Sequence, residues 1–222
     1  MKSSLNNLKL WFHPVKNITT AEGGAVTTND YNLYKKLLLI RENGHDISKI
    51  DIKRYPTEYD ISILGFNFRI NEINSSLGIS QIKKVNKFIN LKKKIAKQYF
   101  EELNLPEISL PDKRILQVSA LHLFIIKIKF QKLKIDKFQL INILKKKNIN
   151  INSHYIPLNR FSFIKKNIKS TRLINSERYY KEAISIPMYP DLIYKKQKYF
   201  IKILIQTIKK YKKIKNDYKI KK

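Results

Sequence analysis

The most informative segment of this 222-residue chain runs from Phe12 to Asp30 and reads FHPVKNITTAEGGAVTTND. It places the pair Gly23-Gly24 between two β-prone runs, which predicts a hairpin that turns at the two glycines. Asp30 closes the segment and has the side chain of a helix N-cap, so a helix is expected directly after it. Gly44 then marks the end of that helix, because glycine adopts the left-handed backbone common there.

The pattern beyond this segment alternates helices and strands, which indicates an α/β fold. A helical rhythm of apolar residues predicts one long helix over about 71–102. Pro106 and Pro111 follow it, so we expect one domain over 1–100 and a second over 101–222. Within the second domain the sequence predicts strands at 121–130, 149–156 and 184–187, and helices at 137–147, 176–183 and 195–213. The tail 215–222 is expected to fray.

The composition excludes several classes of protein. The formal net charge is +29, which first suggests a polyanion-binding protein, but 39 of the 46 basic residues are lysines spread along the chain. Arginine makes the bidentate base contacts and is scarce, so a nucleic-acid-binding module is the weaker interpretation. With no cysteine, disulfides and thiolate catalysis are excluded. Neither a signal peptide nor a membrane-spanning run is found, so the expected compartment is the cytoplasm.

General site motifs are absent from the sequence. The four histidines lack the spacing of a metal site, and no metal is expected. Neither the dinucleotide-binding nor the phosphate-binding glycine loop occurs. On these grounds alone, the residues support only an α/β domain.

The segment from Phe12 to Asp30 closely resembles the cofactor-lysine segment of the sugar aminotransferases that depend on pyridoxal phosphate (PLP), the DegT/DnrJ/EryC1/StrS family. Further matches follow in the same order along the chain. They are Gly65-Phe66-Asn67-Phe68-Arg69, Leu77-Gly78-Ile79-Ser80-Gln81, His122-Leu123-Phe124, His154-Tyr155-Ile156-Pro157 and Ile184-Ser185-Ile186-Pro187. The resemblance therefore covers nearly the whole chain, from about Phe12 to Lys213.

This resemblance implies the fold of a type I aminotransferase, represented here by the end of the large PLP-binding domain and the small C-terminal domain. The implied reaction transfers an amino group, normally from glutamate, through a PLP Schiff base to a nucleotide-linked 4-keto sugar. Such enzymes serve the synthesis of surface glycans, pseudaminic acid among them. The implied partners are a second copy in a homodimer, or a complementing N-terminal half.

The resemblance implies roles for five residues. Lys16 matches the lysine that binds the cofactor covalently and moves the proton, which requires a primary amine able to lose its charge. Asn67 matches the residue that reaches the cofactor phosphate of the other subunit. Arg69 is a candidate for fixing that segment or the subunit interface, or for binding substrate. His154 and Tyr155 match a stretch near the sugar-nucleotide pocket.

The chain departs from the family pattern in two respects. Trp11 stands where relatives usually carry a serine of the phosphate cup. Residues matching the family's Gly-Thr phosphate loop, stacking aromatic and ring-nitrogen aspartate do not precede Lys16. Loss of that aspartate would weaken the electron sink on which the chemistry depends. The expected identity is therefore the C-terminal portion of such an enzyme, with a catalytically inactive remnant as the alternative.

Overall fold

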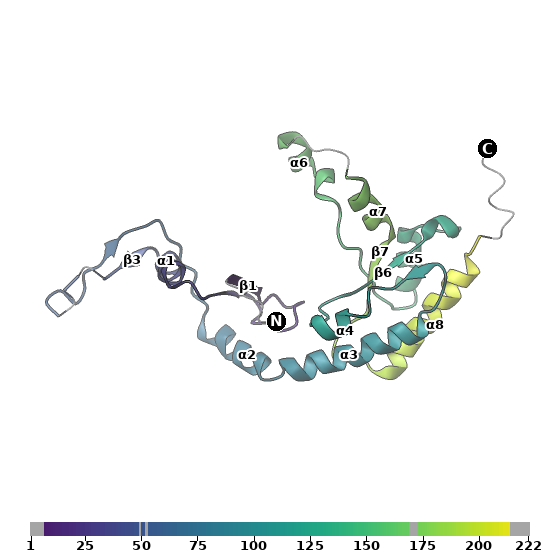
Figure 1. Cartoon of the computed structure of the whole chain (residues 1–222), viewed down its shortest axis with the longest axis horizontal. Coiled ribbons are helices and arrows are strands. Elements are labelled where there is room, and N and C mark those ends of the chain that lie inside the picture. Colours follow the sequence, from purple (N-terminus) through teal and green to yellow (C-terminus); the bar gives the residue numbers. More distant parts are fainter. Residues whose placement is uncertain (1–6, 49, 52, 169–172, 214–222) are drawn as a thin grey trace. The chain divides into compact units, whose positions relative to one another are not determined.

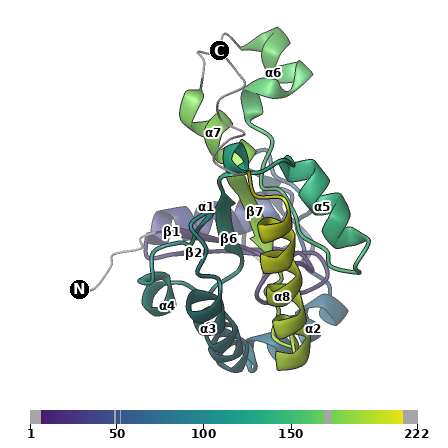
Figure 2. The ribbon, with the colours of Figure 1, turned by 90° about the vertical axis from the view of Figure 1, so that its right-hand side faces the viewer.

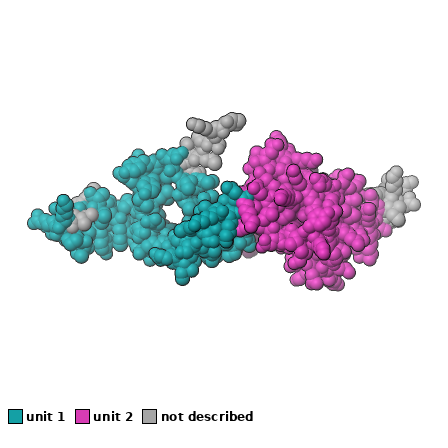
Figure 3. All heavy atoms as spheres, turned by 90° about the horizontal axis from the view of Figure 1, so that it is seen from below, with its two compact units in different colours: residues 1–86 teal, residues 87–222 magenta. Residues whose placement is uncertain are grey.

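The computed structural model describes residues 7–213, except 49, 52 and 169–172, so the expected fraying of 215–222 lies outside the described residues. The chain divides into two compact units, residues 1–86 and 87–222 (Figure 3). Within the described residues, no helix combines the length and apolar character needed to cross a bilayer. The assignment of 1–100 and 101–222 to two domains of a larger enzyme stays a prediction.

The first unit begins with strands β1 (Asn7–Trp11) and β2 (Gly24–Thr28), which pair antiparallel. A hairpin turning at Gly23-Gly24 was therefore the wrong expectation, because Gly24 pairs with Trp11 and lies inside a strand. Residues 12–23 form the connection instead. The threonines at 19 and 20, which favour a strand by propensity, donate their hydroxyl protons to backbone carbonyls and close a loop.

Helix α1 (Tyr31–Arg41) follows β2 and has the predicted ends. The Asp30 carboxylate accepts hydrogen bonds from the backbone N–H groups of Asn32 and Leu33, which confirms it as the N-cap. Gly44 lies beyond the C-terminal end with a φ of +79°, and its N–H donates to the Leu39 carbonyl at 2.7 Å. Strand β3 (His45–Asp46) then pairs with β4 (Asp60–Ile61).

The long helix predicted over 71–102 is two helices, α2 (Glu72–Ile82) and α3 (Val85–Glu102) (Figure 1). The helical hydrogen-bond ladder is interrupted at Lys83 and Lys84, where the Lys84 N–H bonds to the Gln81 carbonyl in a tighter turn. No residue of α2 is fully buried, whereas α3 buries Ile95, Ala96 and Tyr99. The apolar residues keep a helical spacing across Lys83 and Lys84. The sequence pattern alone therefore predicts one continuous helix.

The second unit is built on a three-stranded antiparallel sheet in the order β5-β6-β7, with bounds Ile108–Ser109, Phe124–Ile128 and Ala183–Ile186. Helices α3 and α8 (Tyr194–Lys210) lie side by side, and the Gln197 amide on α8 donates to the Ile95 carbonyl on α3 (Figure 2). The remaining helices are α4 (Ile115–Val118), α5 (Lys137–Lys145), α6 (Ser162–Asn167) and α7 (Ile174–Glu182), with 3-10 turns η1 (Phe130–Lys132) and η2 (Leu158–Arg160). One continuous apolar core joins the sheet to its helices.

The strand predicted at 149–156 is wrong. Only Asn152 bridges to the sheet, through two backbone hydrogen bonds with Ser185 on β7. The chain then leaves the sheet at Ser153 and returns to it at Ala183. By contrast, the strand around 124–128 and the helices beginning near residues 137, 174 and 194 confirm the predictions made for them.

Candidate functional site

Lys16 lies in the turn that connects β1 to β2. Its backbone N–H donates to the His13 carbonyl at 2.9 Å, so residues 13–16 form a tight turn. Phe12 anchors the base of the connection, because its N–H donates to the Gly23 carbonyl and its own carbonyl accepts from the Thr20 N–H, both at 3.0 Å. The backbone on which Lys16 is carried is therefore held on both sides.

Thr20 is the buried centre of this connection, with only 3% of its surface exposed. Its hydroxyl donates to the Glu22 carbonyl at 2.7 Å. A Cβ added at Gly78 on α2 would lie 2.8 Å from the Thr20 methyl group, so the helix approaches the connection closely. The Asn74 amide on the same helix also donates to the Glu22 carbonyl. Helix α2 therefore backs the lysine turn.

The Lys16 side chain is half-buried, and its Nζ lies 5.9 Å from the centroid of the Trp11 ring. The indole is itself 72% exposed. It offers one N–H donor and no acceptor, and its bulk occupies the position where the family pattern has a serine. Among the described residues, the Lys16 amine has no carboxylate partner.

This turn can be tested for its fit to PLP by the donors it offers. The amine of Lys16 fits the covalent anchor, because it is a primary amine with no ion-pair partner in the described part of the chain. The two hydroxyls nearest in sequence do not fit the phosphate, because Thr19 and Thr20 already donate to the carbonyls of Phe12 and Glu22. The residues of this turn therefore fit the anchor and leave the phosphate and the ring nitrogen to other groups.

Asn67 and Arg69 lie in a second segment of the same unit. This segment runs beside the end of α1, where Asn67 forms an antiparallel bridge with Glu42. The Arg69 Nε lies 3.2 Å from a Glu42 carboxylate oxygen, and the rings of Phe66 and Phe68 stack with centroids 4.9 Å apart. This ion pair ties Arg69 to the end of α1, while its roles at a subunit interface or toward substrate stay predictions.

Close packing of two glycines holds this segment in place. A Cβ at Gly65 would lie 2.1 Å from the Gly44 nitrogen, so no larger residue fits without backbone movement. The Asn67 side chain is exposed, and no hydrogen bond joins it to Lys16 among the described residues. The structure thus places the two proposed cofactor contacts in separate segments, each rigidly backed.

His154 and Tyr155 lie in the second unit, where their rings pack edge to face with centroids 4.5 Å apart. Neither ring nitrogen of His154 has a hydrogen-bond partner among the described residues, and burial lowers its pKa. Tyr155 is 71% exposed. The two ring nitrogens of His154 are buried and unpaired among the described residues, and the exposed phenol of Tyr155 is suited to contact a polar ligand.

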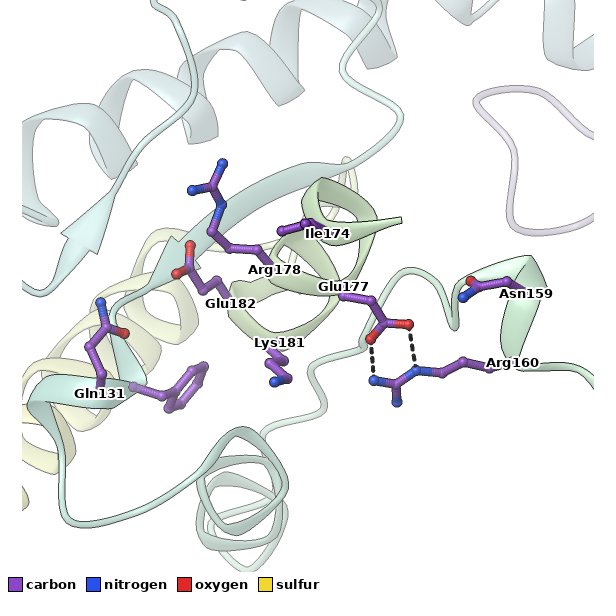
Figure 4. Close-up of a pocket in the computed structure, with 9 residues that line it drawn as sticks. Gln131, Asn159, Arg160, Ile174, Glu177, Arg178, Lys181 and Glu182 are labelled. Atoms are coloured by element: carbon purple, nitrogen blue, oxygen red, sulfur yellow. Dashed lines mark hydrogen bonds and ion pairs between the residues drawn. The ribbon is translucent and has the colours of Figure 1, made fainter. Parts of the chain in front are cut away.

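The second unit contains two pockets among its described residues, and Tyr155 lines one of them. One, of about 630 Å³, is lined by Tyr155, Ile156, Pro157, Leu158, Asn175, Ser176 and Tyr179. The other, of about 600 Å³, lies around α7 and includes the ion pair between Arg160 and Glu177, whose Nε and Oε1 are 2.9 Å apart (Figure 4). Tyr155 therefore faces a cavity, as a ligand contact would require.

Sequence reasoning missed two structurally important groups. Thr20 lies in a threonine-containing run whose composition predicts a strand. Its burial depends on contact with α2, which lies more than fifty residues further along the chain. Lys137 is only 4% exposed, yet nothing distinguishes it from the other 38 lysines by composition. In both cases the signal comes from tertiary contacts and is absent from local patterns.

The fold and the lysine turn together define a class of protein, the sugar aminotransferases. The profile of the "DegT/DnrJ/EryC1/StrS aminotransferase family" matches residues 9–205. The chain belongs to this family, as the resemblance predicted.

Individual relatives agree with this assignment. A UDP-4-amino-4,6-dideoxy-N-acetyl-beta-L-altrosamine transaminase of Campylobacter jejuni is 32% identical over 203 residues, covering 91% of this chain and 52% of its own. The structure of Helicobacter pylori PseC, an aminotransferase of pseudaminic acid biosynthesis, superposes with a TM-score of 0.82 at 28% identity, covering 93% and 54%. The PLP form of a putative sugar aminotransferase from Streptococcus pneumoniae gives 0.79 at 24% identity, covering 92% and 52%.

The chain spans about half the length of the relatives that it matches. Over that half, the likenesses confirm the predicted fold class, α/β with the type I aminotransferase fold.

Proposed function

We propose that this chain supplies the C-terminal half of a PLP-dependent aminotransferase that acts on a nucleotide-linked 4-keto sugar. The observation that carries the proposal is the turn around Lys16. A half-buried primary amine sits there on a backbone that Phe12, Thr20 and helix α2 hold in place, inside the region that the family profile matches. Residues 1–100 would then end the large domain, and 101–222 would form the small domain.

The role of Lys16 follows from its chemistry. Its Nζ would hold the cofactor covalently and would carry the proton that amino transfer requires. When bound, PLP supplies the electron sink for amino transfer. The turn holds the Lys16 backbone in place, which restricts where the amine can lie and favours proton transfer. Glutamate is the proposed amino donor.

Other residues are assigned to binding. The Asn67 amide is an exposed donor on a segment that Gly65 packs tightly, which suits a contact with the cofactor phosphate of a second subunit. His154 and Tyr155 are proposed to contact the nucleotide sugar, since Tyr155 lines a cavity and both ring nitrogens of His154 are unused. The Campylobacter relative is named as the transaminase of a UDP-linked amino sugar, and the Helicobacter protein as an aminotransferase involved in pseudaminic acid biosynthesis. Both names support this substrate class.

Reductive trapping tests the proposal. The chain is mixed with the N-terminal half of the Campylobacter relative, which is the part of that relative outside the match, then with PLP and borohydride. Peptide mapping is expected to find the reduced adduct on Lys16 and to lose it in Lys16→Ala. The added half completes the cofactor site around the amine, so labelling is expected to be weaker without it.

Lys35→Ala is the matched control. The Lys35 amine also lies over an aromatic ring, 4.6 Å from the Tyr31 centroid, but on an exposed helix. Its removal is expected to leave the adduct unchanged. Label on another lysine, or the same label after Lys16→Ala, would contradict the assignment.

A further inference from the structure

Residues 153–168 and 173–180 lie off the sheet and form the two described limbs of an arm (Figures 1 and 2). The limbs carry η2, α6 and most of α7. Their apolar side chains are unusually exposed, among them Tyr155 at 71%, Leu158 at 69% and Phe163 at 72%. An arm with so little apolar burial needs polar ties to keep one position.

One ammonium ties both limbs at their base. Lys137, the first residue of α5, donates from Nζ to the Ser153 hydroxyl at 2.6 Å and also to the backbone carbonyl of Tyr180. Ser153 begins one limb and Tyr180 ends the other. One side chain on α5 therefore joins both limbs of the arm at their base.

We propose that Lys137 is the positioning residue of the arm, and that its amine fixes where His154 and Tyr155 are presented to substrate. The second clause rests on the proposed function, because it takes His154 and Tyr155 as substrate contacts. Ser153 directly precedes them, so any movement of the tied hydroxyl is passed to His154 by one peptide unit.

The surroundings of Lys137 show why a lysine there requires explanation. The side chain is 4% exposed and has no carboxylate partner among the described residues. Its Nζ lies 3.7 Å from the centroid of the Tyr180 ring. A buried ammonium costs free energy unless hydrogen bonds and aromatic faces offset the loss of water. A side chain that only filled space at this position would need no charge.

Other charged groups near the arm base come from both limbs. The Arg160 guanidinium on η2 lies 5.0 Å from the Tyr180 ring and pairs with Glu177 on α7, which joins the limbs a second time. Burial first, and the positive charge of Arg160 second, lower the pKa of Lys137 to about 8. The lysine therefore changes charge in an accessible pH range.

The sign of the pH effect follows from this lowered pKa. If the arm opens, Lys137 returns to water and to an ordinary pKa of 10.5. The open state then binds the proton more tightly, so closure becomes more favourable as pH rises from about 8 toward 10.5. The neutral amine still has two N–H groups for the Ser153 hydroxyl and the Tyr180 carbonyl.

Chymotrypsin cleavage within the arm, at Phe161 and Phe163 among other sites, measures its opening in the full chain. Rates are divided by those of an unstructured peptide at the same pH, and fragments are identified by mass spectrometry. In the wild type, the normalised rate is expected to fall about twentyfold between pH 7.5 and 9.5. In Lys137→Met, cleavage at pH 7.5 should be about tenfold faster and flat with pH, because both hydrogen bonds are lost.

Lys137→Arg keeps a charged donor, so it should restore part of the protection at pH 7.5 without restoring the pH slope. Lys145→Met, in the exposed last turn of the same helix, should behave as wild type. Unchanged cleavage in Lys137→Met, or a pH slope that persists in it, would overturn the proposal. Trapping of PLP on Lys16 does not involve the arm, so its failure would count against the proposed function alone.

Discussion

At the scale of single residues, buried polar groups in this chain are placed where they join segments distant in sequence. Glu107 follows this rule in the second unit. Its side chain is 3% exposed, and a carboxylate oxygen lies 2.8 Å from the Lys212 Nζ, just past the end of α8. Backbone bonds from Lys134 to Tyr211 and from Lys213 to Lys132 run alongside. The ion pair thus fastens the C-terminal end of the unit.

Lys212→Met is expected to destabilise the second unit by about 2 kcal/mol, because it leaves a buried carboxylate without its cation. The hydrogen bond from Lys212 lowers the pKa of Glu107 below its ordinary value. A carboxyl with a lowered folded-state pKa stabilises the fold above its unfolded pKa, and this contribution is lost as pH falls through the folded value.

Urea unfolding measures the difference in free energy of unfolding between wild type and Lys212→Met. This difference should therefore be largest near pH 7 and should shrink below about pH 4. Lys209→Met, at an exposed position of α8, is the control and should change stability little. A difference that stays constant down to pH 3 would show that Glu107 and Lys212 do not stabilise the fold as a pair.

At the scale of elements, the sequence predicted what local pattern determines. Helix α1 and the helix beginning at Lys137 have side-chain N-caps, and α8 follows a 3.6-residue apolar period. The break at Lys83 and the missing strand at 149–156 leave no trace in the apolar spacing of the sequence. The candidate site shows the same contrast. The sequence motif predicts Lys16, whereas the buried position of Thr20 is visible only in the tertiary contacts.

Packing of α2 on the lysine turn gives a test at this scale. Gly78→Ala places a methyl group 2.8 Å from the Thr20 methyl, so the turn is expected to loosen although alanine favours the helix. Thr20→Ser removes that methyl and keeps the hydroxyl that bonds to the Glu22 carbonyl. Adding Thr20→Ser to Gly78→Ala should therefore restore the turn.

Reductive methylation followed by mass spectrometry reports the result, because Lys16 is half-buried only while the turn is intact. Its modification rate, relative to that of the exposed Lys35, should rise a few-fold in Gly78→Ala and return toward wild type in the double variant. An equal rise in the single and double variants would mean that the two methyl groups do not meet.

At the scale of the whole molecule, the two units differ in how they are stabilised. The second contains a continuous core in which Tyr99, Phe124, Leu140 and Leu204 are almost fully buried. In the first unit, no large apolar side chain is fully buried among the described residues 7–86, and Leu64 and Ile73 are more than four-fifths exposed. Buried apolar area is the main source of stability, so the first unit should open at a much lower free-energy cost.

Limited proteolysis of the full chain is expected to show this difference directly. Cleavage requires local opening, so its rate follows the free energy of opening when reclosure is fast. Both units contain lysines at which trypsin can cut. The accessibility of these sites, and not their presence in the sequence, therefore determines which unit is digested first. Residues 7–86 should be digested first, leaving a resistant fragment that begins between 87 and 100. If the N-terminal half of a relative covers the exposed apolar faces of the first unit, adding it should slow that digestion and leave the resistant fragment unaffected. Digestion of both units at the same rate would show that the core of the second unit does not fold independently of the first.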